Sequence, residues 1–217
     1  MVDENETATR SRSKRTTHVG EDTWTKFGEF KAAIIGRKGE GAVARALSNL
    51  GMPALHDVLL PDLLGVTQMD HLVRASDAIM VIETKTYGGH ITGSLDSAEW
   101  VQHLAAGEVR HALQNPVHQN HRHCRAVQVV LAGLLVPIAG IIVSAGSATF
   151  CDDLKGRVVP LPRLAEVFRP TPCRSHDPRD LDVAWRRLLD ATAAAEVRRE
   201  EHQEAMRHRR KDDRPIG

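Results

Sequence analysis

The sequence predicts an α/β domain in which a central mixed β-sheet is flanked by helices. Three observations indicate this class: an amphipathic helix pattern ends at Gly51, three strand-like runs follow it, and a capped helix pattern later leads into an apolar strand at 138–144. Elements that alternate in this way pack as layers around one core. The expected order is therefore helix, three strands, helix and strand.

The first helix is predicted from the run GRKGEGAVARALSNLG, residues 36–51. Val43, Leu47 and Leu50 form one apolar stripe, and Gly51 is a natural stop because glycine readily adopts the left-handed conformation found at helix ends. Glu40 lies in the first turn of this helix. Its side chain is therefore free to turn toward the sheet.

Three strand-like runs follow the first helix and are predicted near residues 54–60, 68–74 and 79–87. Residues 75–78 join the last two runs and are short enough for a hairpin. The three runs are therefore expected to form a meander. The run GGHITG, residues 88–93, is expected to be a short return strand.

The second helix is expected to begin at Asn115, whose side chain can cap it, with Pro116 at the first helical position. The apolar run at 129–143 approaches the roughly 20 residues that a membrane span needs. Pro137 at its centre favours a buried helix that ends near Leu135, followed by a strand. A membrane span stays as the alternative, because glycine and proline also occur in such helices.

Length and composition fit one well-cored domain with extensions. The chain has 217 residues, 41% of them hydrophobic, and a net charge of +1, so attraction to nucleic acid or acidic lipid must come from a local patch. Three widely spaced cysteines predict no disulfide framework, which favours a reducing, cytoplasmic location. We expect a disordered arm at 1–22, the domain at 23–170 and a helical extension at 171–217.

The third strand contains two charged residues, Glu83 and Lys85, within a strongly apolar run. Buried charges are costly unless they are paired or bound. Alternate residues of a strand share a face, so Glu83 and Lys85 converge, and the hairpin can bring Asp70 beside Glu83. Two adjacent carboxylates repel unless a divalent cation lies between them. Asp70 and Glu83 are therefore predicted to bind Mg²⁺ or Mn²⁺, the cations that suit carboxylate ligands.

Two further side chains, Glu40 and Gln119, can complete this site from the two helices. The segments that carry the site follow one another along the chain as GRKGE (36–40), QMDH (68–71), IETKTYGG (82–89), EW (99–100) and NPVHQ (115–119). This ordered set resembles the nuclease-related domain known as NERD, a branch of the PD-(D/E)XK nuclease superfamily. The resemblance covers roughly residues 35–150. A signature proline before the catalytic aspartate is absent, and Met69 stands in its place.

The resemblance implies a PD-(D/E)XK-like core with the order α-β-β-β-α-β and a metal-dependent nuclease activity, with DNA as the expected substrate. It further implies the active-site residues, which match Glu40, Asp70, Glu83, Lys85 and Gln119. The chemistry is consistent with the residues themselves, because a magnesium ion polarises a phosphodiester and a lysine offsets the negative charge that grows at phosphorus. The alternative is a degenerate domain that binds nucleic acid or a protein partner without cutting.

Binding of the nucleic-acid backbone is assigned to basic residues near the site. The candidates for phosphate contacts are Arg37, Lys38, Arg74, Arg122 and Arg125, with ordinary surface charge as the alternative. Scarce aromatic residues argue against recognition by base stacking. The run HQNHRHC raises a zinc site as another possibility, with His118, His121, His123 and Cys124 as ligands, although no second ligand cluster has the usual spacing. No membrane partner is expected.

Overall fold

The computed structural model describes residues 19–62, 65–169 and 178–212. They belong to two compact units that divide between Ile35 and Gly36. Helix α1 (Val19–Asn49) begins in the first unit, and the second unit contains both sheets and all the predicted site residues. Most of the predicted arm at 1–22 lies outside the described residues, and the division into domains stays a prediction.

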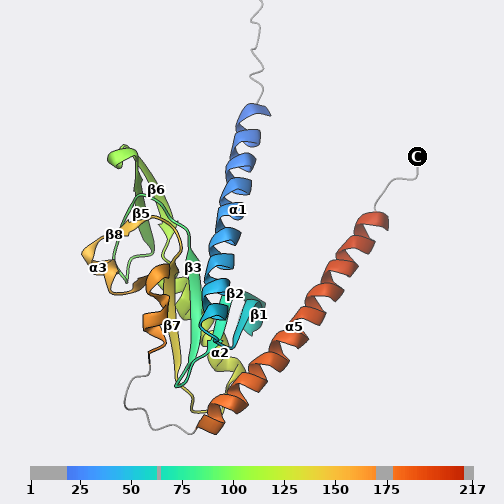
Figure 1. Cartoon of the computed structure of the whole chain (residues 1–217). Helices are drawn as coiled ribbons and strands as arrows, with labels where there is room; N and C mark the ends of the chain where they lie inside the picture. Colours follow the sequence, from blue (N-terminus) through green and yellow to red (C-terminus); the bar gives the residue numbers. More distant parts are fainter. Residues whose placement is uncertain (1–18, 63–64, 170–177, 213–217) are drawn as a thin grey trace, which may run out of the picture. The chain divides into compact units, whose positions relative to one another are not determined.

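The second unit is built on a five-stranded mixed sheet. Its strands, in spatial order, are β1 (Ala54–Asp62), β2 (Gly65–Arg74), β3 (Ile79–Lys85), β7 (Ile138–Ser144) and β9 (Val158–Pro160). The first three strands pair antiparallel, whereas β3, β7 and β9 pair parallel. Figure 1 shows β3 and β7 running side by side through the middle of this unit. The predicted meander and the strand at 138–144 are thus confirmed.

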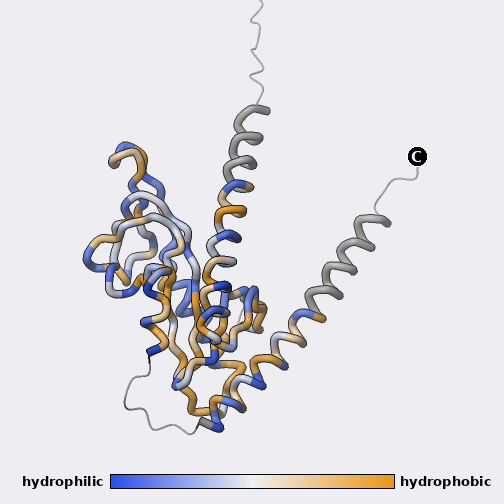
Figure 2. Tube along the Cα trace, viewed as in Figure 1, coloured by the Kyte–Doolittle hydropathy of each residue, from blue (hydrophilic) through white to orange (hydrophobic). Residues whose placement is uncertain are grey.

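Helices cover both faces of this sheet, which confirms the predicted α/β class. On one face, α2 (Pro116–Val130) and the first turns of α5 (Pro178–Asp212) pack on a core that includes Leu72, Val81 and Leu181. On the other face, the last turns of α1 pack with α4 (Leu164–Val167) on a core that includes Val43 and Ile82. Hydrophobic and hydrophilic residues alternate along the first turns of α5, as expected for a helix with one buried stripe (Figure 2).

A smaller sheet is the main feature that the sequence did not predict. Its strand order is β6 (Val109–Gln114), β5 (Glu99–Leu104), β4 (His90–Thr92) and β8 (Thr149–Phe150). The segment GGHITG, expected as a return strand, contributes β4 to this second sheet instead. The predicted order α-β-β-β-α-β therefore holds, with β4, β5 and β6 inserted between β3 and α2.

Short helical turns complete the second unit. They are η1 (Ala105–Gly107), α3 (Asp152–Lys155) and η2 (Leu161–Arg163). The core of the smaller sheet is formed by Ile91, Trp100 and Leu154.

Two helix boundaries differ from the prediction. Helix α1 continues through Gly36 instead of beginning there, and α2 ends at Val130, five residues before the expected end near Leu135. The chain turns directly after α2, where Gly133 adopts a left-handed conformation with φ of 85°. The apolar run at 129–143 is therefore divided between a helix end, a turn and β7. Within the described part of the chain, no helix is both long and apolar enough to cross a membrane.

Candidate active site

The candidate site lies where β2 and β3 separate. The backbone pairing between these strands ends at His71 and Ile82. One residue beyond this pair, the Asp70 carboxylate accepts the backbone N–H of Thr84 at 2.6 Å. A side chain thus replaces the next backbone hydrogen bond, and the carboxyl-terminal end of β3 is left without β2 as its neighbour.

The charged residues of β3 occupy this opening. Lys85 Nζ lies 2.6 Å from Glu83 Oε1, as expected for alternate residues on one face of a strand. Lys85 also donates a hydrogen bond of 3.1 Å to Gln119 Oε1 in α2. The buried Glu83 therefore has the lysine as a partner, and the lysine is held from both the strand and the helix.

The first turn of α2 is fixed by Asn115. Its side chain accepts the N–H of Val117 at 2.9 Å, which caps the helix as predicted. Its amide also donates to the carbonyl of Ser97 at 2.7 Å and to that of Leu95 at 3.0 Å. Asn115 is fully buried, so it ties the helix that carries Gln119 to the loop between β4 and β5.

Burial and mutual repulsion make the carboxylates of this site unusual. Burial first, and then the Asp70 charge, raise the pKa of Glu83 from its ordinary 4.5 to about 7 despite the neighbouring lysine. Burial also raises the pKa of Asp70, although the hydrogen bond from Thr84 opposes this shift. For Glu40, burial followed by the charges of Asp70 and Asp57 raises the pKa. The structure thus brings these acidic groups within electrostatic reach of one another.

Lys85 keeps its positive charge in this environment. Burial alone would lower its pKa, but the charge of Glu83 and the hydrogen bond to it outweigh burial, so the pKa of Lys85 lies above its ordinary value. The ammonium group is therefore protonated at neutral pH.

Close packing of α1 against the sheet explains the position of Glu40. A β-carbon at Gly39 would overlap the Thr86 side chain and come within 3.3 Å of Ala145 Cβ. Only a residue without a side chain allows this approach of the helix to the ends of β3 and β7. The next residue, Glu40, is therefore held beside the carboxylates of the sheet.

His123 is a site residue that the sequence analysis placed only in the zinc alternative. Its Nδ1 lies 3.4 Å from Glu83 Oε2, and both side chains are buried. Neither atom has another hydrogen-bond partner within the described residues. Burial first, and then the charges of Arg122 and Lys85, lower the pKa of His123 to about 4. The neutral ring can therefore offer an N–H to the carboxylate. Its spacing of four residues from Gln119, one helical turn, was the signal in the sequence.

Asp57 is a second residue that the sequence analysis did not single out. It interrupts β1 between Val58, which pairs with Met69, and His56, and it adopts a left-handed φ of 54°. Such irregularities in a strand redirect a side chain, and aspartate tolerates this conformation better than most residues do. The side chain of Gln68 donates a hydrogen bond to it. Its charge contributes to the raised pKa values of both Glu40 and Asp70.

The donor set fits a cation that needs few protein ligands. In the described ranges, no group of three or more His, Cys, Asp or Glu side chains is placed to hold a metal ion. Magnesium, however, commonly binds through one or two carboxylates and keeps several waters. Raised carboxylate pKa values fit such an ion, and so does Glu83 Oε2, which among the described residues has only the long contact of 3.4 Å with His123 Nδ1. The predicted zinc ligands do not converge, because His118 and His121 are exposed while His123 faces Glu83.

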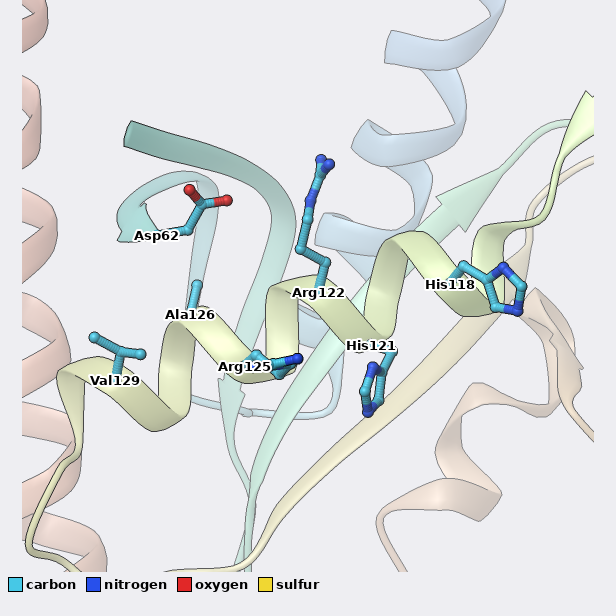
Figure 3. A pocket seen from close by; sticks show the side chains of 7 residues that line it. All are labelled: Asp62, His118, His121, Arg122, Arg125, Ala126 and Val129. Atoms are coloured by element: carbon cyan, nitrogen blue, oxygen red, sulfur yellow. The ribbon is translucent and has the colours of Figure 1, made fainter. Parts of the chain in front are cut away.

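The predicted phosphate-binding residues lie on the two helices beside the site. Arg37 and Lys38 are exposed on α1, and the charge of Arg37 acts on Glu40. Arg122 and Arg125 are exposed on α2 and line a pocket there (Figure 3). Arg74, by contrast, lies 2.5 Å from Asp182 of α5, so its charge is engaged within the protein.

Comparison with known proteins gives two matches. The family model for the nuclease-related domain, NERD, matches residues 35–145. A protein of Bacillus anthracis described as uncharacterised is 39% identical over 97 residues, a match that covers 43% of this chain and 45% of the relative. The chain thus spans less than half the length of that relative.

Proposed function

Because the chain belongs to the nuclease-related domain (NERD) family, we propose that it is a nuclease that hydrolyses phosphodiester bonds of DNA with a divalent metal ion. The observation that carries this proposal is the arrangement at the open end of β3. There Asp70, Glu83 and Lys85 gather in one buried site, and the lysine is anchored at 2.6 Å from Glu83.

Asp70 and Glu83 would hold the cation, which we propose is Mg²⁺ or Mn²⁺. Bound there, the ion would polarise the phosphodiester and favour attack by water. Support comes from the pKa of Glu83, which shows that two ionised carboxylates are unfavourable here without a cation. Burial and the neighbouring Asp70 charge raise this pKa to about 7. A cation would turn this repulsion into attraction.

Lys85 would stabilise the negative charge that develops on the phosphate oxygens. Its ammonium group is already oriented between Glu83 and Gln119, so little reorganisation is needed when that charge appears. Gln119 positions the lysine, and Glu40 lies at the edge of the site, where it can orient water by hydrogen bonding. Exposed Arg37, Lys38, Arg122 and Arg125 would bind phosphates of the backbone.

A binding module without catalysis is the second candidate. The observation that favours it is the small number of ligands, because no group of three or more metal-binding side chains forms within the described residues. Such a module would use the same exposed basic residues of α1 and α2 to bind nucleic acid. It has no need, however, for a lysine anchored beside a pair of buried carboxylates.

The deciding experiment is a cleavage assay with Mg²⁺, Mn²⁺ or EDTA on single-stranded DNA, duplex DNA and RNA. We expect metal-dependent cleavage of DNA by the parent and none by Asp70→Asn or Glu83→Gln, since each change keeps the shape of the side chain but removes its charge. Glu108→Gln is the matched control, because Glu108 is exposed in the connection between β5 and β6 and lies outside the site. Equal cleavage by the parent and Glu83→Gln would disprove the assignment, and a parent inactive on all substrates that still binds DNA would favour the binding module.

A further inference from the structure

A pocket on the exposed face of α2 is not used by the proposed catalytic residues. It has a volume of about 450 Å³ and is lined by Asp62, His118, His121, Arg122, Arg125, Ala126 and Val129. Figure 3 shows that all of these side chains except Asp62, at the end of β1, come from α2. The pocket therefore lies on α2, the helix whose Gln119 accepts a hydrogen bond from Lys85 of the candidate site.

The position along α2 connects the pocket to that site. Gln119, which accepts a hydrogen bond from Lys85, precedes Arg122 by three residues and Arg125 by six. At about 1.5 Å per residue, the two arginines lie roughly 4.5 and 9 Å further along the helix axis. A strand with its scissile phosphate beside Lys85 can thus place its next nucleotides over these arginines, because stacked nucleotides are about 3.4 Å apart along one strand.

The lining combines two kinds of surface. Val129 is apolar and half exposed, and the buried Ala126 lies beside it, so the pocket has an apolar patch between them. The exposed side chains of His121, Arg122 and Arg125 add donors and positive charge to the lining, and the Asp62 carboxylate adds one negative charge at the end of β1. A nucleotide has matching parts, an anionic phosphate and a flat base whose ring faces pack on apolar side chains while its polar edge forms hydrogen bonds.

The concave shape of the pocket favours an unpaired nucleotide over a base within a duplex. A phosphate backbone alone needs only an exposed basic surface, whereas an apolar patch inside a pocket binds a group that can enter it. A base within a duplex is stacked and paired, so it reaches such a pocket only after leaving the helix, which costs free energy. An unpaired nucleotide can enter without that cost.

We propose that this pocket binds an unpaired nucleotide of the DNA strand next to the scissile phosphate, so that the preferred substrates carry single-stranded segments. The connection to cleavage rests on the proposed function, but occupancy of the pocket does not require catalysis. Arg122 and Arg125 contact the phosphate, and the base lies against Val129.

The test measures binding by fluorescence anisotropy in EDTA, so it does not depend on cleavage. The probes are a labelled single-stranded DNA, the same strand in a blunt duplex, and the duplex with a single-stranded overhang. Val129→Glu introduces a negative charge that repels the DNA phosphates, so it should weaken binding of the single strand and the overhang about tenfold. Arg125→Ala should weaken binding of the same probes severalfold. It should also reduce the slope of the logarithm of the binding constant against the logarithm of the salt concentration by about 1, as expected for the loss of one phosphate contact.

Matched controls come from α5. Val197 is exposed to a similar extent, 55% compared with 52% for Val129, so Val197→Glu controls for the added charge. Arg186→Ala controls for the loss of an exposed arginine. Both controls should bind like the parent, and thermal denaturation should show that all four variants are folded.

Two results would overturn the proposal. One is Val129→Glu binding the single strand as tightly as the parent does. The other is a blunt duplex that binds as tightly as the single strand and is weakened equally by Val129→Glu. A parent that binds as proposed but cleaves nothing with any metal would instead refute only the proposed nuclease function.

Discussion

Replacing Glu83 by glutamine should stabilise the metal-free protein. In the folded chain the Glu83 carboxyl is buried beside Asp70, and its pKa is raised to about 7, compared with 4.5 ordinarily. The folded state therefore binds more protons than the unfolded state between these two values. Stability of the parent falls as the pH rises through this window, and the loss is complete above about pH 7.

The size of the effect follows from the shift in pKa. Each pKa unit corresponds to about 1.4 kcal/mol, so ionising Glu83 costs the folded parent about 3 kcal/mol at pH 8. At pH 5 Glu83 is protonated in the folded state and about one quarter protonated in the unfolded state, so the cost is only about 1 kcal/mol. Glutamine has the shape of the protonated acid and cannot ionise. The stabilisation by Glu83→Gln should therefore be about 3 kcal/mol at pH 8 and about 1 kcal/mol at pH 5.

The assay is urea denaturation of both proteins in EDTA at pH 8 and pH 5, together with thermal melting. For a chain of this size, 3 kcal/mol corresponds to a rise of roughly 6–12 °C in Tm. Adding Mg²⁺ at pH 8 should stabilise the parent and leave the variant unchanged, because a ligand stabilises only the state that binds it. Glu108→Gln, an exposed control, should change neither value. A variant less stable than the parent at pH 8, or equal gains at both pH values, would refute the reasoning.

Substitutions at Lys85, His123 and Gly39, with controls, separate the roles of the neighbouring residues. Lys85→Ala should bind Mg²⁺ with nearly the affinity of the parent in calorimetry but cleave at least about 100-fold more slowly in single turnover, because the lost charge acts mainly on the transition state; a loss of metal binding would argue against this role. His123→Leu removes the ring nitrogen that lies 3.4 Å from Glu83 Oε2 and should weaken Mg²⁺ binding about tenfold, whereas His123→Asn, which keeps a polar group there, should recover most of it; equal affinities of the leucine variant and the parent would contradict the contact. Gly39→Ala should lower stability by about 1–3 kcal/mol and reduce cleavage, because its β-carbon overlaps a side chain at the end of β3. Gly36→Ala, whose β-carbon has room, should instead gain up to about 1 kcal/mol in the same denaturation experiment, and equal effects of the two alanines would show that close packing at Gly39 is not the cause.

Local patterns were enough to predict four of the five strands of the main sheet and the central pair of the site, whereas β9 was not predicted. Alternation along β3 places Glu83 and Lys85 on one face, and this depends only on the two-residue period of a strand. The cap at Asn115 with Pro116 likewise depends on neighbouring residues, and α2 begins where it was predicted. The family match at residues 35–145 agrees with the resemblance of the ordered motifs.

The smaller sheet could not be predicted in the same way. Its strand β4 has three residues and pairs with β8, so that His90 lies beside Thr149. No local pattern encodes a contact between residues so far apart in sequence, and strands this short have little periodicity of their own. The end of α2 was misplaced for a related reason, since the apolar residues after Val130 continue the composition of the helix while the chain already turns toward β7.

By itself, the sequence determined the α/β class, strands β1, β2, β3 and β7 of the main sheet, and the convergence of Glu83 and Lys85, because these follow from the periodicity of neighbouring residues. Only the tertiary structure decided that His123 and Asp57 also belong to the site. His123 reaches Glu83 because α2 packs across β3, and Asp57 acts on Asp70 because β1 departs from regular strand geometry at that residue. Both depend on how separate elements pack against one another, and such packing is a property of the whole fold rather than of any short segment.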